Sequence, residues 1–440
     1  MEETLVLSLL LGIFLPFPLI LVLFKLFVCN SNSRRFHYFT TAAECRAIID
    51  GSHFPGGRKN QLSPYEARAD VPENQAAKQA FGIRNSFASR SETESKIFVH
   101  NVQELIDHRK IDWMIIRRAC RRTAYGAVHD ILSKGTRNSD DIAGEMKLSL
   151  TAVTQAMTLR ALLCILKLSF HGEDIETEHL ISLGAIIHRI SMDTERGQEY
   201  KIKFEDNRAL HQVLADVFPR LKIDKLLLDR TSPLNYILPA FEPTWRVVRR
   251  MFLELYYRDR HPGHQGQDWG SILSEFAAEP DDRRFDFRIQ DGYHVSTEML
   301  VKEALRLFTP TGHVRRVFQF EGEGGQVIGA ADVGACHLDE KIWGCDALDF
   351  NPDRWRKASA MQELSFLPFG SRPSLCPAHA RVGPMLVGLL VGTCWDMFKH
   401  MEMRSDDEEE IVGLKGGEGM RSYRGAYDGF YFALPGSGSP

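Results

Sequence analysis

The sequence predicts a mainly α-helical protein with small β-sheets, preceded by one transmembrane helix at the N-terminus. Apolar residues recur at helical spacing through most of residues 101–260, whereas strand-like stretches are short. The chain has 440 residues, of which 44% are hydrophobic and 25% charged. These globular proportions exclude a largely disordered or collagen-like chain. Residues 4–24 form an uncharged apolar run, which predicts the membrane segment.

Residues 4–28 are expected to anchor the protein in a membrane. As a helix, the run 4–24 would span about 31 Å, against a hydrocarbon core of about 30 Å. The chain starts Met-Glu-Glu and lacks the basic start and small-residue cleavage site of a signal peptide. Lys25, Arg34 and Arg35 follow the run. The positive-inside rule therefore predicts that the rest of the chain lies in the cytosol.

The remaining chain divides into a polar linker at 29–35 and one large domain at 36–440. Its scattered cysteines include no C-x-x-C pair, which removes the support for a zinc ribbon or a thioredoxin-type redox pair. Free thiols are typical of a reducing compartment, which agrees with a cytosolic domain. The net charge of −4 gives no indication of a nucleic-acid partner.

Within the large domain, helices are predicted where the periodicity is strongest. Residues 36–100 mix strand-like and turn-rich pieces, and the tail 421–434 suggests a hairpin. Pro239 and Pro243 are expected to break one helix, and Ser296 or Thr297 can cap another. The predicted helices are 111–132, 151–170, 233–258, 296–308 and 377–400, with short strands within 313–330.

A turn-rich loop at residues 366–378, FLPFGSRPSLCPA, is the sharpest local signal in the chain. Pro377 suits a first helical turn, so Cys376 is expected at a helix N-terminus. The helix dipole and free N–H groups there favour a thiolate, which can ligate a metal such as haem iron. The alternative is an inert cysteine buried in a helix cap, and the loop alone leaves both interpretations open.

Charged residues at helical spacing form two further candidate sites. Glu303 and Arg306 lie three residues apart and can pair, and Arg354 could close a network with them. Trp113 and Arg117 lie four residues apart, so an indole N–H and a guanidinium on one helix face can hold a carboxylate. Each pattern alone is more often a solvent-exposed pair or a packing contact.

In this order along the chain, the motifs resemble those of the cytochrome P450 family, the haem-thiolate monooxygenases. The likeness covers roughly residues 100–400 and implies the cytochrome P450 fold, in which helical layers enclose a haem. The anchor and the style of the sequence resemble microsomal members from fungal secondary metabolism. The matching residues are Trp113 and Arg117, Glu303 and Arg306, Arg354, and Cys376 with its loop.

The resemblance implies haem b, iron protoporphyrin IX, as the cofactor, with the Cys376 thiolate as the axial iron ligand. Phe369 would pack beside the sulfur, and Trp113 with Arg117 would bind a haem propionate. Glu303, Arg306 and Arg354 would form the buried structural network of the family. The further cofactor-binding residues that it implies are Gly370, Arg372 and Ala378 in the loop and His313, with Arg315 and Arg316 as open alternatives to His313.

The loop departs from the family pattern before and after the cysteine. The family usually has glycine four residues before it and a basic residue two before it, where this chain has Arg372 and Ser374. Arg372 is the candidate replacement for the usual propionate contact. Ala378 stands where glycine is common, which is a mild change.

The oxygen-activating motif of the family, Ala/Gly-Gly-x-Asp/Glu-Thr, is best matched by residues 239–244, PAFEPT. Glu242 then takes the place of the acid and Pro243 that of the threonine, with Thr244 next. Proline has no hydroxyl or N–H group that could donate a hydrogen bond, and it disturbs the helix. Glu242, Thr244 and water are therefore the expected proton carriers, and a kinked core helix without this role is the alternative.

The resemblance implies a monooxygenase that oxidises a lipophilic small molecule with dioxygen and electrons from NADPH-cytochrome P450 reductase. The anchor implies the endoplasmic reticulum membrane, with the catalytic domain on the cytosolic side. A basic helix face could steer the acidic reductase. The alternatives are a haem-dependent rearrangement or dehydration without external electrons, and a non-catalytic relative. The residues of that face are Arg117, Arg118, Arg121 and Arg122.

Overall fold

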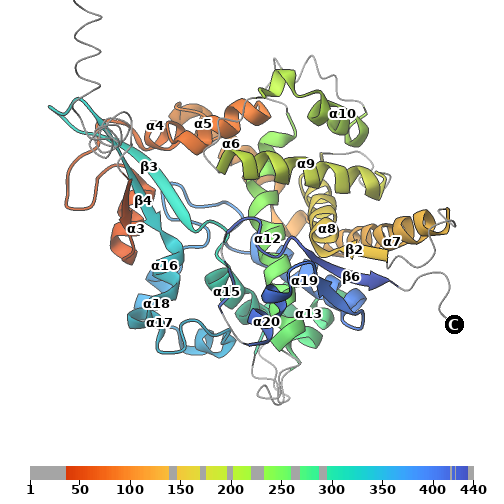
Figure 1. The fold of residues 1–440 in the computed structure, drawn as a ribbon. Coiled ribbons are helices and arrows are strands. Elements are labelled where there is room, and N and C mark those ends of the chain that lie inside the picture. The colour runs from red at the N-terminus through yellow and green to blue at the C-terminus, as the bar shows by residue number, and fades with distance from the viewer. Residues whose placement is uncertain are drawn as a thin grey trace, which may run out of the picture.

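The computed structural model shows a mainly helical protein with small sheets, which confirms the predicted class (Figure 1). The expected anchor and linker lie outside the described residues. Within the described part, no helix combines the length and the apolar character needed to cross a bilayer. The structure describes residues 36–137, 146–168, 175–195, 202–219, 232–258, 268–286, 295–416, 419–421 and 423–434.

The elements of the first half are β1 (Phe36–Phe39), α3 (Ala42–Asp50), α4 (Pro64–Ala69), α5 (Pro72–Phe81), α6 (Glu92–Leu105), α7 (Trp113–Arg137), β2 (Met146–Ser149), α8 (Leu150–Ile165), α9 (Thr177–Glu195) and α10 (Arg208–Val217). Those of the second half are α12 (Leu234–Arg258), α13 (Trp269–Ala278), α14 (Asp282–Asp286), α15 (Thr297–Leu307), β3 (His313–Gln319), β4 (Gln326–Asp332), α16 (Val333–Leu338), α17 (Glu340–Trp343), α18 (Ala360–Ser365), α19 (Val382–Phe398), β5 (Met403–Ser405), α20 (Glu408–Lys415) and β6 (Phe430–Leu434). Short 3-10 turns include η3 (Pro352–Lys357).

Two three-stranded sheets lie on opposite sides of the helical body (Figure 1). In the first sheet, β4 is central, with β1 parallel to it and β3 antiparallel. In the second, β6 is central and pairs antiparallel with β2 and β5. Because β6 pairs with β2 and β5, which both lie before residue 421, the hairpin expected within 421–434 is wrong.

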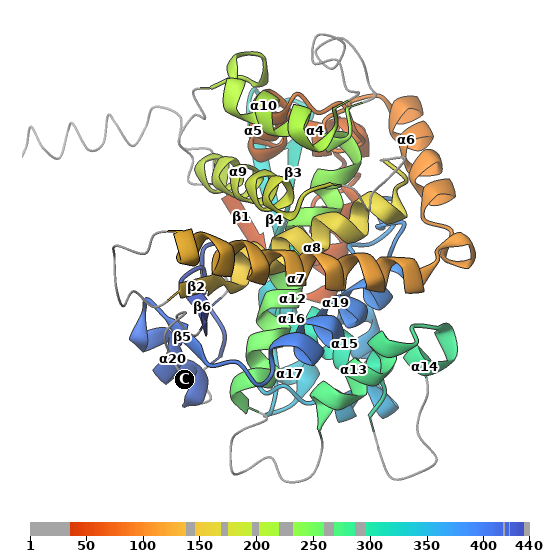
Figure 2. The ribbon, with the colours of Figure 1, turned by 90° about the vertical axis from the view of Figure 1, so that its right-hand side faces the viewer.

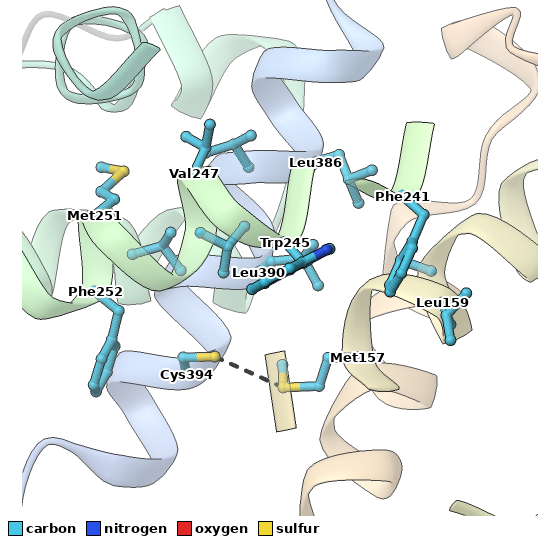
Figure 3. Packing of buried hydrophobic residues seen from close by; sticks show 14 of the residues in the cluster. Met157, Leu159, Phe241, Trp245, Val247, Met251, Phe252, Leu386, Leu390 and Cys394 are labelled. Carbon is cyan, nitrogen blue, oxygen red and sulfur yellow. Dashed lines mark hydrogen bonds between the residues drawn. The ribbon is translucent and has the colours of Figure 1, made fainter. Parts of the chain in front are cut away.

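The core lies where α7, α8, α12 and α19 pack on one another, with α7 crossing the molecule in Figure 2. Phe241 and Trp245 of α12 face this core and are fully buried (Figure 3). Leu390 of α19 lies beside them, and the Cys394 sulfur lies 3.7 Å from that of Met157 in α8. Large apolar side chains from three helices therefore hold α12 in place.

This packing explains the helix that the sequence expected to be broken. The helix α12 runs through Pro239 and Pro243 from end to end, so the expected break is wrong. Each proline removes one backbone donor, but Phe241 and Trp245 anchor the same stretch in the core. Tertiary burial therefore outweighs the local cost of the two prolines.

Helices α3 to α6 occupy a region that the sequence analysis described as strand-like and turn-rich. The helices α3, α4 and α6 have N-terminal side-chain caps, whereas Val71, the N-cap of α5, makes no side-chain hydrogen bond. The Ser63 side chain accepts from the Glu66 N–H in a complete capping box. The Ser91 side chain accepts from the Glu94 N–H at the start of α6. The predicted helices 111–132, 233–258 and 296–308 are confirmed as α7, α12 and α15. The helix predicted at 151–170 is present as α8, which ends earlier, at Ile165.

Two glycines let α13 and α19 approach closely. A Cβ atom on Gly392 would lie 2.0 Å from the Leu273 carbonyl oxygen, and one on Gly270 would lie 2.0 Å from the Trp395 ring. Neither position leaves room for a methyl group. The close contact fixes α19, the helix that follows the cysteine loop.

We expect Gly392→Ala to lower the free energy of unfolding by about 2–3 kcal/mol, because the added methyl group forces two packed helices apart. Urea denaturation followed by far-ultraviolet circular dichroism measures this change. Gly325→Ala is the matched control, since a Cβ atom there would meet nothing within 4 Å. Equal effects of the two substitutions would contradict the packing argument.

Candidate functional site

Cys376 lies in a loop that folds back on itself between α18 and α19. Its N–H donates to the Phe369 carbonyl at 3.0 Å, so residues at the two ends of the loop lie side by side. Gly370 turns the chain with a φ of +72°, a left-handed value that favours glycine. Its N–H donates to the Leu367 carbonyl at 3.0 Å. The loop therefore holds the cysteine through its backbone.

Cys376 is not at a helix N-terminus, because α19 begins only at Val382. That expectation is wrong, and with it the support from a helix dipole. Burial raises the pKa of the Cys376 thiol, while the Ala378 N–H directed at the sulfur acts in the opposite direction. A metal bound to the sulfur would deprotonate it outright. The Ala378 N–H, rather than a helix dipole, is thus the local group that favours the thiolate.

The other loop residues divide between the protein interior and the surface. The Phe369 ring packs on the first turn of α19, where a Cβ atom on Gly383 would lie 3.0 Å from it. The Ala378 carbonyl accepts from the Gly383 N–H at 2.9 Å. Arg372 is exposed. Phe369 and Ala378 therefore join the loop to α19, and Arg372 points to solvent.

The predicted network around Glu303 is present and buried. Arg306 reaches both carboxylate oxygens, at 2.7 and 3.1 Å, and neither side chain is exposed to solvent. Arg354 donates through Nε at 2.9 Å. Trp355 adds its indole N–H at 2.9 Å, and the Asn351 backbone adds its N–H at 3.0 Å. Five donors, from α15 and from residues 351–355, thus converge on one carboxylate.

The same two arginines organise the irregular chain that follows α16. Arg306 Nη1 donates to the carbonyls of His337 and Ala347, at 2.8 and 2.7 Å. Arg354 donates to the Trp343 carbonyl at 2.8 Å and to the Asp346 carboxylate at 3.1 Å. Buried guanidinium groups need this degree of hydrogen bonding. The network therefore fixes the chain as well as its own charges.

His337 connects this network with the cysteine loop, a role that the sequence analysis missed. The Leu367 N–H donates to His337 Nε2 at 2.8 Å, so Nδ1 carries the ring proton. Nδ1 in turn lies 3.1 Å from the Arg306 carbonyl and donates to it. Burial lowers the pKa of His337 to about 3. No local pattern around GACHLD marks this histidine.

Trp113 and Arg117 lie one turn apart at the start of α7, as predicted. Trp113 is buried and Arg117 half-buried. Among the described residues, the Arg117 guanidinium has neither a hydrogen bond nor an ion pair. Arg121, on the same helix, forms an ion pair with Asp396 of α19, so its charge is partly neutralised within the protein.

The three basic candidates on β3 differ in their partners. His313 is exposed, with Nε2 3.4 Å from Asp332, and Arg315 pairs with Glu73. Arg316 is 4% exposed and donates only to the Arg315 carbonyl, at 2.8 Å. Its Nε has no partner within the described chain. Arg316 is therefore better placed than His313 to receive an anion.

On α12, the carboxylate of Glu242 pairs through one oxygen with Arg424 of the C-terminal segment 423–428. The other oxygen, Oε1, is buried and has no partner among the described residues. Thr244 is half-buried. Glu242 is thus fixed by an ion pair that sequence reasoning did not foresee.

A second ion pair joins α12 to the same C-terminal segment. The fully buried Arg249 pairs with Asp428 and also donates to the Thr151 hydroxyl at 2.6 Å. His188 Nε2 lies 3.0 Å from Asp428 on its other side. Two ion pairs therefore join segment 423–428 to α12, and its Asp428 also bonds to Thr151 of α8 and His188 of α9.

The residues present fit a haem group. A single half-buried thiol that accepts a backbone N–H suits a thiolate–iron bond. Arg117 and Arg316 offer two guanidinium groups that have no carboxylate partner in the described part of the chain, as the two haem propionates require. The donor set thus matches both the metal and the acidic edge of the group.

The model of the family "Cytochrome P450" matches residues 295–414. This stretch contains Glu303, Arg306, Arg354 and the loop of Cys376, that is, the buried network and the candidate ligand. The match thus agrees with the geometry of the C-terminal part of the chain.

Similar curated proteins match over short stretches. Cytochrome P450 CYP749A22 of Panax ginseng is 35% identical over 91 residues, covering 18% of this chain and 17% of that protein. Cytochrome P450 72A397 of Kalopanax septemlobus is 30% identical over 126 residues, covering 26% and 23%. Echinocystic acid 23-monooxygenase of Saponaria officinalis is 33% identical over 88 residues, covering 18% and 17%. The matches therefore span less than a quarter of each relative.

Among solved structures, the P450 monooxygenase TamI bound to tirandamycin C has a TM-score of 0.44 at 14% identity. A Streptomyces CYP154C4 structure has a TM-score of 0.46 at 15% identity. In both cases the alignment covers 84% of each chain.

We expect Arg306→Met to lower the free energy of unfolding by about 3–5 kcal/mol, because it leaves the Glu303 charge partly uncompensated in the core. Chemical denaturation of both proteins measures the difference. Lys302→Met is the control on the same helix, since Lys302 makes a partly exposed pair with Glu298 at 2.8 Å. A small loss in both variants would contradict the importance assigned to the buried network.

We expect a pH-dependent stability from His337. Its folded-state pKa of about 3 lies below the ordinary 6.5, so below pH 6.5 the unfolded chain binds a proton that the folded one excludes. Above pH 6.5 the contribution of His337 to the free energy of unfolding is fully present. It decreases as the pH falls from 6.5 toward 3, and at about pH 5 about 2 kcal/mol of it has been lost.

The measurement compares the free energy of unfolding at about pH 7.5 and about pH 5. His337→Gln should remove this part of the pH dependence, whereas His100→Gln, at an exposed position, should keep it. An unchanged pH dependence in His337→Gln would show that the excluded proton belongs to another group.

Proposed function

We propose that this chain, whose residues 295–414 match the cytochrome P450 family model, is a haem-thiolate monooxygenase. One observation carries the proposal: the backbone-held Cys376 loop is bonded through His337 to the buried Glu303 network. This arrangement presents a single sulfur ligand on a rigid frame. It suits a metal that a porphyrin already holds by its other positions.

The chain's own residues would bind and orient the cofactor. Haem, when bound, supplies the activation of dioxygen for insertion into a substrate bond. The Cys376 sulfur would bind the iron, and the Ala378 N–H would stabilise its negative charge. Phe369 would limit the access of water to the sulfur. Trp113 and Arg117 would hold a propionate from α7.

Protons for this reaction would move along α12. We propose that Glu242 accepts a water or hydroxyl proton at its unpartnered Oε1, with the Thr244 hydroxyl next in line. Arg424 holds the other carboxylate oxygen and so keeps the side chain in one orientation. Pro243 has no N–H, which leaves a helix carbonyl free to bind a water beside these groups.

The partners follow from the same reaction. The electron donor would be the flavoprotein NADPH-cytochrome P450 reductase, attracted by the basic face of α7, and the substrate a lipophilic small molecule of secondary metabolism. The Saponaria relative is named a monooxygenase, which supports this class of reaction. Residues 4–28 would anchor a microsomal-type, fungal protein in the endoplasmic reticulum membrane, with the domain on the cytosolic side.

A rearrangement or dehydration at haem, without external electrons, is the second candidate. Two observations favour it. Pro243 stands at the position of the threonine of the family motif, and the Glu242 carboxylate, at the position of its acid, is already paired with Arg424. Consumption of NADPH by the protein with reductase and substrate separates the two reactions. A non-catalytic haem protein would bind haem but would convert no substrate, either with the reductase and NADPH or without them.

We expect Cys376→Ala to abolish the thiolate-type absorption of the reduced, carbon monoxide-bound protein, because the iron loses its sulfur ligand. Difference spectroscopy on the purified full-length chain measures this. Cys345→Ala is the control, since Cys345 is an exposed free thiol outside the loop. An unchanged spectrum in Cys376→Ala would refute the ligand assignment and, with it, the proposed function.

A further inference from the structure

Two arginines are buried beside the first sheet, and neither has a carboxylate partner among the residues that the structure describes. Arg68 of α4 is 7% exposed and Arg316 of β3 is 4% exposed. Arg68 donates to the Ser95 hydroxyl at 3.3 Å, and Arg316 donates to the Arg315 carbonyl. The Nε atoms of both arginines are buried and have no partner within the described chain. Neither positive charge is therefore matched by a carboxylate in contact with it.

The acidic groups nearby are engaged elsewhere. Glu73 pairs with Arg315, the neighbour of Arg316 on the opposite face of the strand. Asp50 accepts from the Ser52 N–H at 2.9 Å, although it lies near enough to attract Arg316. Burial, together with the like charge of Arg68, lowers the pKa of Arg316 to about 9. The two guanidinium groups thus repel one another in a poorly solvated place.

Both arginines lie at the end of α3, next to the cysteine loop. A Cβ atom on Gly51 would lie 3.5 Å from Ala67, the neighbour of Arg68, and 3.5 Å from the Arg316 side chain. Two residues earlier, Ile49 lies 3.9 Å from the corresponding position on Gly370 of the loop. Figure 1 shows α4 beside β3 at this edge of the helical body.

We propose that Arg68 and Arg316 together form a receptor for one carboxylate of the haem, a two-guanidinium site assembled from α4 and β3. The inference rests on the proposed function and extends it to a residue, Arg68, that no sequence motif marks. It also accounts for the departure in the loop. Ser374 stands where a basic residue is usual and Arg372 points to solvent, so the loop itself offers little charge to a propionate.

An anion between the two arginines would balance their charges. Two buried cations of like charge destabilise the folded chain, whereas an anion between them gains two charge-assisted hydrogen-bond partners. Removal of Arg68 should therefore have opposite effects in the two states. It relieves repulsion when haem is absent and removes an anion contact when haem is present. If Arg68 had a purely structural role, its removal would lower the stability of the folded chain both with and without haem.

The experiment uses the full-length chain and two probes, haem and haem dimethyl ester, whose propionates carry no charge. Transfer of each porphyrin to excess apomyoglobin gives its rate of release. In Arg68→Met, haem should be released about tenfold faster than in the unaltered chain, while the release of the ester changes little. Arg68→Lys should recover part of the difference, since it restores the charge.

Arg90→Met is the matched control, because Arg90 lies beside α4 but is exposed and pairs with Glu66 and Asp70, both at 3.3 Å. It should leave the release of both porphyrins unchanged. Without haem, the melting temperature of Arg68→Met should equal or exceed that of the unaltered chain, because a buried like charge is removed.

Equal acceleration of haem and ester release in Arg68→Met, or no acceleration of either, would overturn the assignment while leaving a haem-binding protein and the proposed function intact. A lower melting temperature without haem would indicate a structural arginine and also overturn it. Failure of the unaltered chain to retain haem would overturn both the assignment and the proposed function.

Discussion

The carboxylate of Glu303 is the interaction on which the rest of the site depends. It is fully buried, and its charge is compatible with the core only because Arg306, Arg354, Trp355 and a backbone N–H surround it. The spare donors of the two arginines then bind carbonyls of the irregular chain. Through His337 the same frame reaches the cysteine loop. The position of the sulfur is thus a consequence of satisfying one buried charge.

The sequence predicts the parts of this arrangement that are encoded within short windows. Glu303 and Arg306 lie one helical turn apart, and the turn-rich loop identifies Cys376 by its own composition. The helices of the bundle are recognisable because their apolar residues repeat every turn. Position relative to distant segments is not encoded in this way. The start of α19 at Val382, rather than next to Cys376, depends on how the loop packs on that helix.

Residues whose role depends on distant partners were missed for the same reason. His337 acts through Leu367 and Arg306, and Arg68 gains significance only beside Arg316, far along the chain. A solitary histidine or arginine in the sequence carries no sign of such a neighbour. The continuity of α12 through two prolines is a related case, because burial of Phe241 and Trp245 overrides the local preference.

The attachment of segment 423–428 to α12 bears on the order in which the interior of the fold is completed. Glu242 and Arg249 of α12 receive their charged partners from residues 182 and 179 positions later in the chain. A ribosome therefore delivers that segment well after α12 has been synthesised. Until then, a half-buried carboxylate and a buried cation of α12 lack these partners. A chain that stops before residue 423 would thus carry its defect at α12, in the middle of the fold.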